Sequence, residues 1–244
     1  RLQGDWSSDV CSSDLMKLRN TVLIVLFSQI MFVGTAQAIG GLGLQLGQAT
    51  ASIPAFSIPS GPATLTTTAF SNPITIGGYF YIDAIPFVDL EADILIKGQE
   101  YDFNFVNALG TIGPFTFGWG SISTYLSFRK KLMSLSLPLL AKAKLYYGGG
   151  YNMHKVTPLM TVDLMKEFMD GDIESSPTGF TEKDLINKLE ENLVDASGFH
   201  VQAGLQFKLF MLDSFLFYRY TLTKDVIPDN DGFGSINLRV GIGI

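Results

Sequence analysis

Hydrophobic and polar residues alternate along the last stretch of the chain. From Ser235 to Ile244, aliphatic residues occupy every second position, and polar residues or glycine occupy the positions between them. Successive side chains of a β-strand point to opposite faces, so this segment predicts a strand with one wholly aliphatic face. The same alternation recurs between Pro86 and Gly98 and between Gly198 and Phe210. The shared pattern indicates a protein built from amphipathic strands.

Weaker alternation elsewhere brings the number of predicted strands to eight. These further strands are expected near residues 41–47, 76–83, 117–130, 142–154 and 214–224. Long loops are expected over residues 49–73, 98–114, 155–197 and 225–232, and short turns join the other strand ends. An even number of strands, with short turns at one end and long loops at the other, is typical of bacterial outer-membrane barrels. We therefore predict an all-β fold, an antiparallel up-and-down transmembrane β-barrel of about eight strands.

The first residues of the chain do not read as protein. Asp5 to Leu15 look like the translation of a sequencing adaptor, so residues 1–15 are interpreted as an artefact and the natural start is placed at Met16. The single cysteine, Cys11, lies in this stretch. Small exported proteins commonly rely on disulfides. This fold is therefore expected to be held together by other means.

The segment that follows Met16 predicts export from the cytoplasm. Two basic residues precede an apolar run over residues 22–33, and a small-residue triplet ends at Ala38. This is the layout of a secretory signal peptide. We predict a signal peptide over residues 16–38, cleavage after Ala38, and a mature barrel domain over residues 39–244 in the outer membrane.

The predicted mature domain is acidic. The charges of the artefact and of the signal peptide cancel, so it keeps the net charge of −6 of the whole chain. Nucleic-acid binding needs a basic surface, so we expect no nucleic-acid partner.

Three segments of the chain resemble the small eight-stranded outer-membrane β-barrels, the outer-membrane protein A-like or porin-family barrel domains. They are the glycine-rich first strand, the triplet Gly148-Gly149-Gly150, and the C-terminal strand over residues 234–244. The resemblance covers residues 39–244. It implies contact with outer-membrane lipid and insertion by the barrel-assembly machinery.

Charged residues of the predicted strands indicate which face of each strand points into the barrel. A soluble sandwich or barrel is the alternative, but its interior would have to be apolar. With the polar faces turned inward, four acids meet five bases, and such a balance is what paired burial of charge requires. This predicted lumen network consists of Asp83, Asp89, Glu91, Asp93, Arg129, Lys144, Lys208, Arg219 and Arg239. Side chains fill an eight-stranded lumen, so the network is expected to plug it.

The longest predicted loop, over residues 155–197, is the best candidate for a binding region. It holds ten acidic residues against four lysines. Short helices are expected from Thr181 and over Val162 to Met169, so the loop carries a short helical insertion. We interpret the loop as a solvated cap over the barrel mouth, with docking of an extracellular ligand as the sharper hypothesis.

No residue pattern in the chain favours catalysis or a cofactor. The oxygen-rich segments Asp170 to Glu174 and Asp229 to Gly232 lack the spacing of an EF-hand calcium loop, so we expect no metal. His154 and His200 are expected at the outer ends of adjacent strands, and no nucleophile motif accompanies them. The prediction is a non-enzymatic barrel protein, structural or surface-binding. The alternatives are a lipid-modifying barrel enzyme and a small-solute channel.

Overall fold

The computed structural model describes residues 40–83, 87–137, 141–169, 171–172, 174, 182–209 and 211–243. The predicted adaptor artefact, the signal peptide and the cleavage position after Ala38 lie outside these residues. Among the residues that are described, no helix is both long and apolar enough to cross a membrane.

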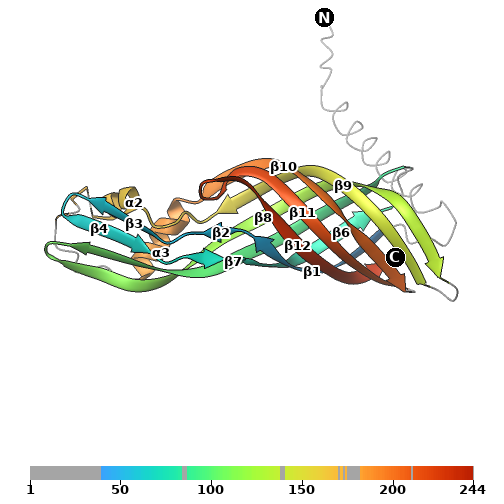
Figure 1. Cartoon of the computed structure of the whole chain (residues 1–244), viewed down its shortest axis with the longest axis horizontal. Coiled ribbons are helices and arrows are strands. Elements are labelled where there is room, and N and C mark those ends of the chain that lie inside the picture. The colour runs from blue at the N-terminus through green and yellow to red at the C-terminus, as the bar shows by residue number, and fades with distance from the viewer. Residues whose placement is uncertain are drawn as a thin grey trace, which may run out of the picture. The chain divides into compact units, whose positions relative to one another are not determined.

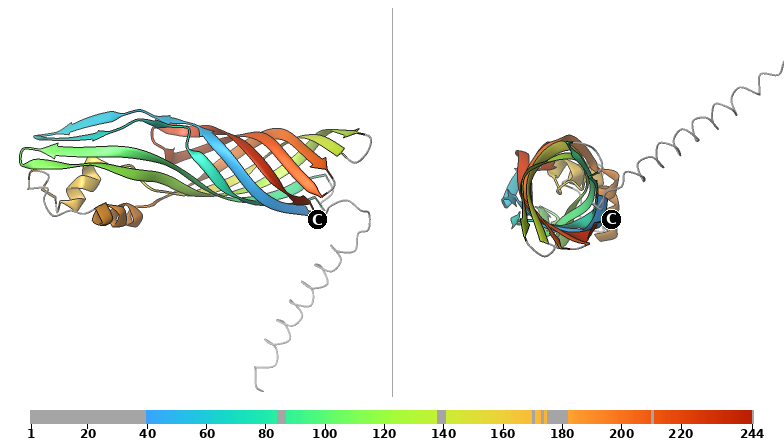
Figure 2. Two further views of the ribbon diagram at one scale, coloured as in Figure 1. Left: turned by 90° about the horizontal axis from the view of Figure 1, so that it is seen from below. Right: turned by 90° about the vertical axis from the view of Figure 1, so that its right-hand side faces the viewer.

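Eight long strands form a closed antiparallel barrel, as predicted. Each pairs with its neighbours along the chain, and β1 pairs with β12, which places Gly41 opposite Gly243 and closes the ring. Seen along its axis in Figure 2, the barrel is a continuous ring of strands. The strands are β1 (Gly40–Thr50), β6 (Ile74–Ile82), β7 (Asp89–Asn107), β8 (Gly110–Leu137), β9 (Ala141–Val156), β10 (Val194–Leu209), β11 (Leu212–Ile227) and β12 (Asn230–Gly243).

The two faces of each strand lie where the alternation predicts. On β12, Leu238 is exposed and its neighbour Arg239 has no exposed surface. On β1, Leu44 is 72% exposed, whereas the next residue, Gln45, is completely buried. Because the side-chain period of a strand is two, one register fixes the face of every residue in it. The aliphatic faces therefore point outward and the polar faces fill the lumen.

The glycine triplet of β9 allows three strands to approach closely. A Cβ atom at Gly150 would overlap the carbonyl oxygen of Leu126 on β8. One at Gly148 would lie 2.5 Å from the carbonyl oxygen of Phe128. Real Cβ atoms do not come so near to backbone, so these positions need glycine.

The prediction of a long loop over residues 98–114 is wrong, because β7 and β8 continue as strands far beyond the barrel wall. They run on to Asn107 and from Gly110, with a turn of two residues between them. Inward Tyr101, Phe103 and Phe105 continue the alternation of β7 through this stretch and are buried. Glycine and proline near Gly110 and Pro114 favoured a loop, but the aromatic alternation outweighs them.

Two more predicted loops are largely strand. Residues 49–73 contain β2 (Ser52–Ile53), β3 (Phe56–Ser60), β4 (Ala63–Thr67) and β5 (Phe70–Ser71). β4 pairs with the distal part of β7, with Thr64 opposite Val106. Residues 225–232 are mostly the ends of β11 and β12, joined through a turn at Pro228 and Asp229.

The predicted helical insertion is present as α2 (Val162–Phe168) and α3 (Glu182–Glu191). The side chain of Thr161 caps α2 by accepting a hydrogen bond from the backbone N–H of Leu164. Such a cap satisfies one of the free N–H groups at a helix start. The capping role expected of Thr181 falls on a residue outside the described part of the chain.

A folded head extends from the barrel end opposite Gly41 and Gly243 (Figure 1). We use this name for β2 to β5, residues 98–120 of β7 and β8, and the two helices. Buried Phe103, Trp119, Met165 and Leu185 belong to one apolar cluster that joins these elements. The head therefore has a hydrophobic core of its own.

Candidate functional site

Charged side chains from four strands meet inside the barrel. β7 supplies Glu91 and Asp93, and β8, β11 and β12 supply Arg129, Arg219 and Arg239. All five residues are buried. Each lies on the inward face of its strand, because inward residues recur at every second position.

Arg239 bridges the lumen. Its Nη2 atom donates hydrogen bonds of 2.7 and 2.6 Å to the two carboxylate oxygens of Asp93. Its Nη1 atom lies 3.0 Å from Glu91 Oε1, and its Nε atom donates a hydrogen bond of 2.7 Å to Gln45 Oε1. Because β1 and β6 separate β12 from β7 in the barrel wall, the contacts with Glu91 and Asp93 tie together two strands that are not neighbours.

Arg219 reaches the same acids from β11. Its Nη2 atom donates to Asp93 Oδ2 at 2.5 Å and to Gln202 Oε1 at 2.7 Å. The amide nitrogen of Gln202 in turn donates to Glu91 Oε2 at 2.7 Å. Charge-assisted hydrogen bonds of this kind are stronger than neutral ones. The two acids of β7 are thus held from three sides.

Arg129 connects this centre to the barrel end where Gly41 and Gly243 lie. Its Nη2 atom lies 3.1 Å from Asp83 Oδ1 and 3.0 Å from Asp89 Oδ2. Its Nη1 atom lies 3.2 Å from Glu91 Oε1, as an ion pair without hydrogen-bond geometry. Asp83 and Asp89 are partly exposed, so Arg129 links the buried centre to the solvated mouth.

The two lysines of the predicted network lie at its margin. Lys144 Nζ is 3.7 Å from Asp83 Oδ2, and both side chains are partly exposed. Lys208 is 3.6 Å from Asp213 and contacts none of the four predicted acids within ion-pair distance. The structure therefore joins eight of the nine predicted residues, and Lys208 belongs to a separate pair.

Sequence reasoning missed several residues of the lumen. Asp213 is buried and accepts hydrogen bonds from Tyr81 and Gln206. Asp213 directly precedes the strand predicted near residues 214–224, although it lies on the same inward face of β11 as Arg219. Lys97 lies on the same inward face of β7 as Asp93 and is buried. Lys97 lies within the alternating segment between Pro86 and Gly98, and extending the predicted strand near residues 214–224 by one residue would have included Asp213.

Aromatic rings surround the three guanidinium groups. The Arg239 guanidinium lies 4.4 Å from the ring centre of Phe217 and 4.9 Å from that of Tyr79. Arg219 lies 4.1 Å from the ring centre of Tyr125. Cations are attracted to ring faces, and more strongly when both groups are desolvated. Apolar surface therefore packs the spaces between the charges and excludes water.

The histidines are not at the barrel rim, contrary to expectation. His154 is 3% exposed and His200 1%, and both point into the lumen. His154 lies 2.7 Å from Ser123 Oγ and 2.9 Å from Asn152 Oδ1, so a hydroxyl, an imidazole and an amide stand in a row. A row of this kind could hydrolyse a substrate only if the substrate had room beside the hydroxyl. Ser123 is 1% exposed, and the cavity beside it has a volume of about 10 Å³, so a substrate has no room there.

Among the described residues, no three histidine, cysteine, aspartate or glutamate side chains form a group suited to a metal ion. In the oxygen-rich segment at residues 170–174, Asp170 and Ile173 lie outside the described part.

The outer surface of the barrel is apolar. Large apolar side chains from every barrel strand are exposed; most are aliphatic, among them Leu46, Ile76, Ile94, Val201 and Leu216. A water-soluble protein rarely exposes so large a continuous apolar surface. Lipid is the solvent that suits an aliphatic exterior around a charged interior. This arrangement defines a transmembrane β-barrel.

Comparisons with known proteins give likenesses of fold only. No protein-family model and no curated protein matches the chain. Among solved structures, Neisserial surface protein A is 12% identical, covering 84% of this chain and 97% of its own, with a TM-score of 0.42. The N-terminal barrel domain of Pseudomonas aeruginosa OprF is 10% identical, covering 83% and 98%, with a TM-score of 0.38. Ail, the attachment invasion locus protein of Yersinia pestis, is 12% identical, covering 83% and 96%, with a TM-score of 0.35.

Proposed function

We propose that this protein is a non-enzymatic outer-membrane barrel whose closed lumen supports a folded, acidic head outside the cell. The observation that carries the proposal is the contact of Arg239, on β12, with both buried acids of β7 across the lumen. Removing one partner of a buried ion pair leaves an uncompensated charge, so such a bridge resists opening. A lumen held in this way suits anchoring or surface binding better than passage of solutes.

The outer membrane is the location that the barrel surface supports. Every barrel strand exposes large apolar residues, and the strands pair around a closed ring, as a lipid environment requires. Export by the predicted signal peptide, with cleavage after Ala38, would deliver the chain to the periplasm. Insertion by the barrel-assembly machinery, with the short turns in the periplasm, would then leave the head outside.

We propose the acidic part of the head as the surface that meets an extracellular partner. Asp163 and Glu191 have highly exposed side chains on α2 and α3. A hydrogen bond from Lys188 to Glu167 links the two helices at 2.6 Å, and this bond raises the pKa of Lys188. The lysine is thereby held in its charged form and bound to its neighbour. The remaining exposed acids would favour a partner of positive charge.

The channel and the lipid-modifying enzyme have less support. The cavity beside the ion-pair network has a volume of about 10 Å³, which is room for about one water molecule. Neither a hydrated solute nor an acyl chain fits such a space. His154 and His200, the residues that the enzyme alternative would use, are buried in the lumen.

Three measurements test the proposal. The protein should fractionate with the outer membrane and migrate differently on a gel before and after boiling. Protease added to intact cells should cleave the head and leave a barrel fragment. In planar lipid bilayers the purified protein should give no single-channel currents at physiological salt.

Other outcomes would contradict separate parts of the proposal. Recovery of the mature protein as a soluble periplasmic species would refute the membrane location. Steady single-channel currents would refute the closed lumen, provided that a variant opening the network, Arg239→Met, changes their conductance. An altered lipid composition in cells expressing the protein, lost in a His154→Gln/His200→Gln variant, would establish the enzyme instead.

A further inference from the structure

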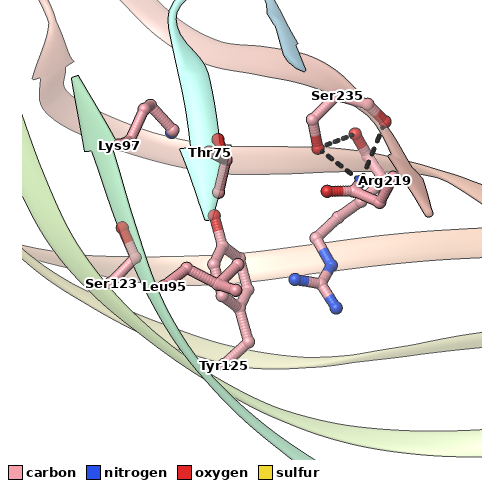
Figure 3. Close-up of a pocket in the computed structure, with 8 residues that line it drawn as sticks. Thr75, Leu95, Lys97, Ser123, Tyr125, Arg219 and Ser235 are labelled. Carbon is pink, nitrogen blue, oxygen red and sulfur yellow. Dashed lines mark hydrogen bonds between the residues drawn. The ribbon is translucent and has the colours of Figure 1, made fainter. Parts of the chain in front are cut away.

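A small cavity lies between the ion-pair network and the head. Its walls come from β6, β7, β8, β11 and β12, and Figure 3 shows the side chains that line it. No acidic side chain is among them. They are Thr75, Leu95, Lys97, Ser123, Tyr125, Arg219, Ser235 and Asn237.

Lys97 is the unusual member of this wall. The residue is 3% exposed, and its Nζ atom finds no hydrogen-bond partner among the described residues. Its contact is the ring of Phe233, whose centre lies 3.7 Å from Nζ. Arg219 Nη1 and Thr75 Oγ1, on the same wall, also lack a partner among the described residues. Two cationic groups and a hydroxyl thus offer free donors around one cavity.

The charge balance of the lumen identifies Lys97 as a surplus cation. Buried Glu91 and Asp93 are engaged by arginines, and Asp213 is engaged by Lys208. The buried bases are Lys97, Arg129, Arg219 and Arg239, and the buried acids are Glu91, Asp93 and Asp213.

The partly exposed groups do not change this result. Asp83 and Asp89 face Arg129, and Lys144 and Lys208 add two cations at the mouth. One positive charge remains unmatched with or without them. Burial of an unpaired charge is strongly unfavourable, so a counter-ion or loss of the proton must compensate it.

We propose that the cavity binds one small monovalent anion of the halide type, held between Lys97 and Arg219. Its single negative charge matches the single surplus positive charge. The cavity has room for about one water molecule, and this small size favours a monatomic ion over polyatomic anions such as phosphate and sulfate. The hydroxyl of Thr75, which has no partner among the described residues, supplies a further donor without adding negative charge. The bound anion would join β7 to β11 at the head end of the lumen.

Thermal unfolding of the predicted mature chain, residues 39–244, folded in detergent micelles tests the proposal, and Trp119 is the single tryptophan of this segment. The unfolding midpoint is followed by the fluorescence of Trp119 in sodium bromide, sodium chloride and sodium gluconate at equal ionic strength. Gluconate is too large for the cavity. Because a ligand that binds only the folded state raises its stability, the halide salts should raise the midpoint by about 2 °C or more.

Two variants separate a specific site from a general salt effect. Lys97→Met removes the surplus charge and keeps a side chain of similar length, so the difference between halide and gluconate should vanish. Lys224→Met changes an exposed lysine of the head side, 76% exposed, and should keep the full difference. Equal midpoints of the unsubstituted protein in bromide and gluconate would overturn the proposal. An undiminished difference in Lys97→Met would do so as well.

Crystals grown in sodium bromide give a result that does not depend on any variant folding. An anomalous peak from bromine within hydrogen-bond distance of Lys97 Nζ is expected. A water molecule at that position, or an amine with no anion beside it, would show that Lys97 is compensated by losing its proton, and the proposal would then fail.

Discussion

Replacing Arg239 with methionine should be the most damaging single change in the lumen. The guanidinium donates four hydrogen bonds, of 2.6 to 3.0 Å, to Gln45, Glu91 and Asp93. Methionine fills part of the same space but leaves these groups without their cation. Arg219 still holds Asp93 and Arg129 still lies near Glu91, so the individual bonds do not add up.

The expected magnitude follows from the burial of the network. Breaking a buried ion pair by removing one partner costs about 3–5 kcal/mol. Since about 1.4 kcal/mol is a factor of ten, the equilibrium constant for unfolding should rise by roughly two to three and a half orders of magnitude. Urea titration of the barrel in lipid vesicles, read by Trp119 fluorescence and by heat-modifiable migration, measures this change.

The control must be an exposed residue without backbone strain. Asp225 is unsuitable, since its φ of 63° lies in the left-handed region, where a substitution to alanine adds strain of its own. Lys224→Met is the better match and should change the free energy of unfolding by less than about 0.5 kcal/mol.

A double variant, Arg239→Met with Glu91→Gln, isolates the cost of unpaired charge. It should recover part of the loss, because glutamine in place of Glu91 removes one uncompensated charge. An Arg239→Met loss no greater than that of Lys224→Met would refute the reasoning. Strict additivity in the double variant would also count against it.

Three further substitutions test the close approach of strands in the barrel wall, the apolar outer surface and the head. Gly150→Val places a side chain onto the carbonyl of Leu126 and should prevent closure, seen as loss of the heat-modifiable band, whereas Gly118→Val, at a position with open space, should fold. Leu238→Lys should cost about 2–4 kcal/mol if the residue faces the middle of the bilayer, and a cost below about 0.5 kcal/mol in urea titration would argue for a solvated surface. Thr161→Ala removes the cap of α2 and should cost about 1 kcal/mol locally, measured as faster hydrogen exchange in α2 with no change in the barrel strands.

The barrel could be predicted from sequence because inward and outward residues alternate along each strand, so every second residue shares a face. One inward residue such as Asp93 fixes the inward face of the whole of β7, and the acids and arginines of neighbouring strands then follow. This alternation does not give the position of a residue along the barrel axis. Lys208 and Lys144 lie on the inward face but near the mouth of the barrel. The alternation gives the face of a residue only, so it could not predict how far these lysines lie from the central acids.

The head could not be predicted for a different reason. Gly98, Gly110 and Pro114 are strong turn signals when they are read locally, and they led to a loop. In the structure, burial of Tyr101, Phe103 and Phe105 against Trp119 and its neighbours holds the same stretch extended. That apolar cluster joins segments far apart in the chain, and its formation depends on contacts that no local window contains.

The seam between β1 and β12 sets a condition on assembly. Gly41 faces Gly243, and Arg239 meets its two acids across 146 and 148 residues of chain. Contacts between such distant segments form late, because the loop that they close is costly in entropy. The hairpin of β7 and β8 is local and can form early.

Until β12 arrives, Glu91 and Asp93 lack Arg239 in an unclosed sheet, where their charge opposes entry into lipid. Arrival of the last described strand both seals the wall and adds the one described arginine that forms ion pairs with both acids.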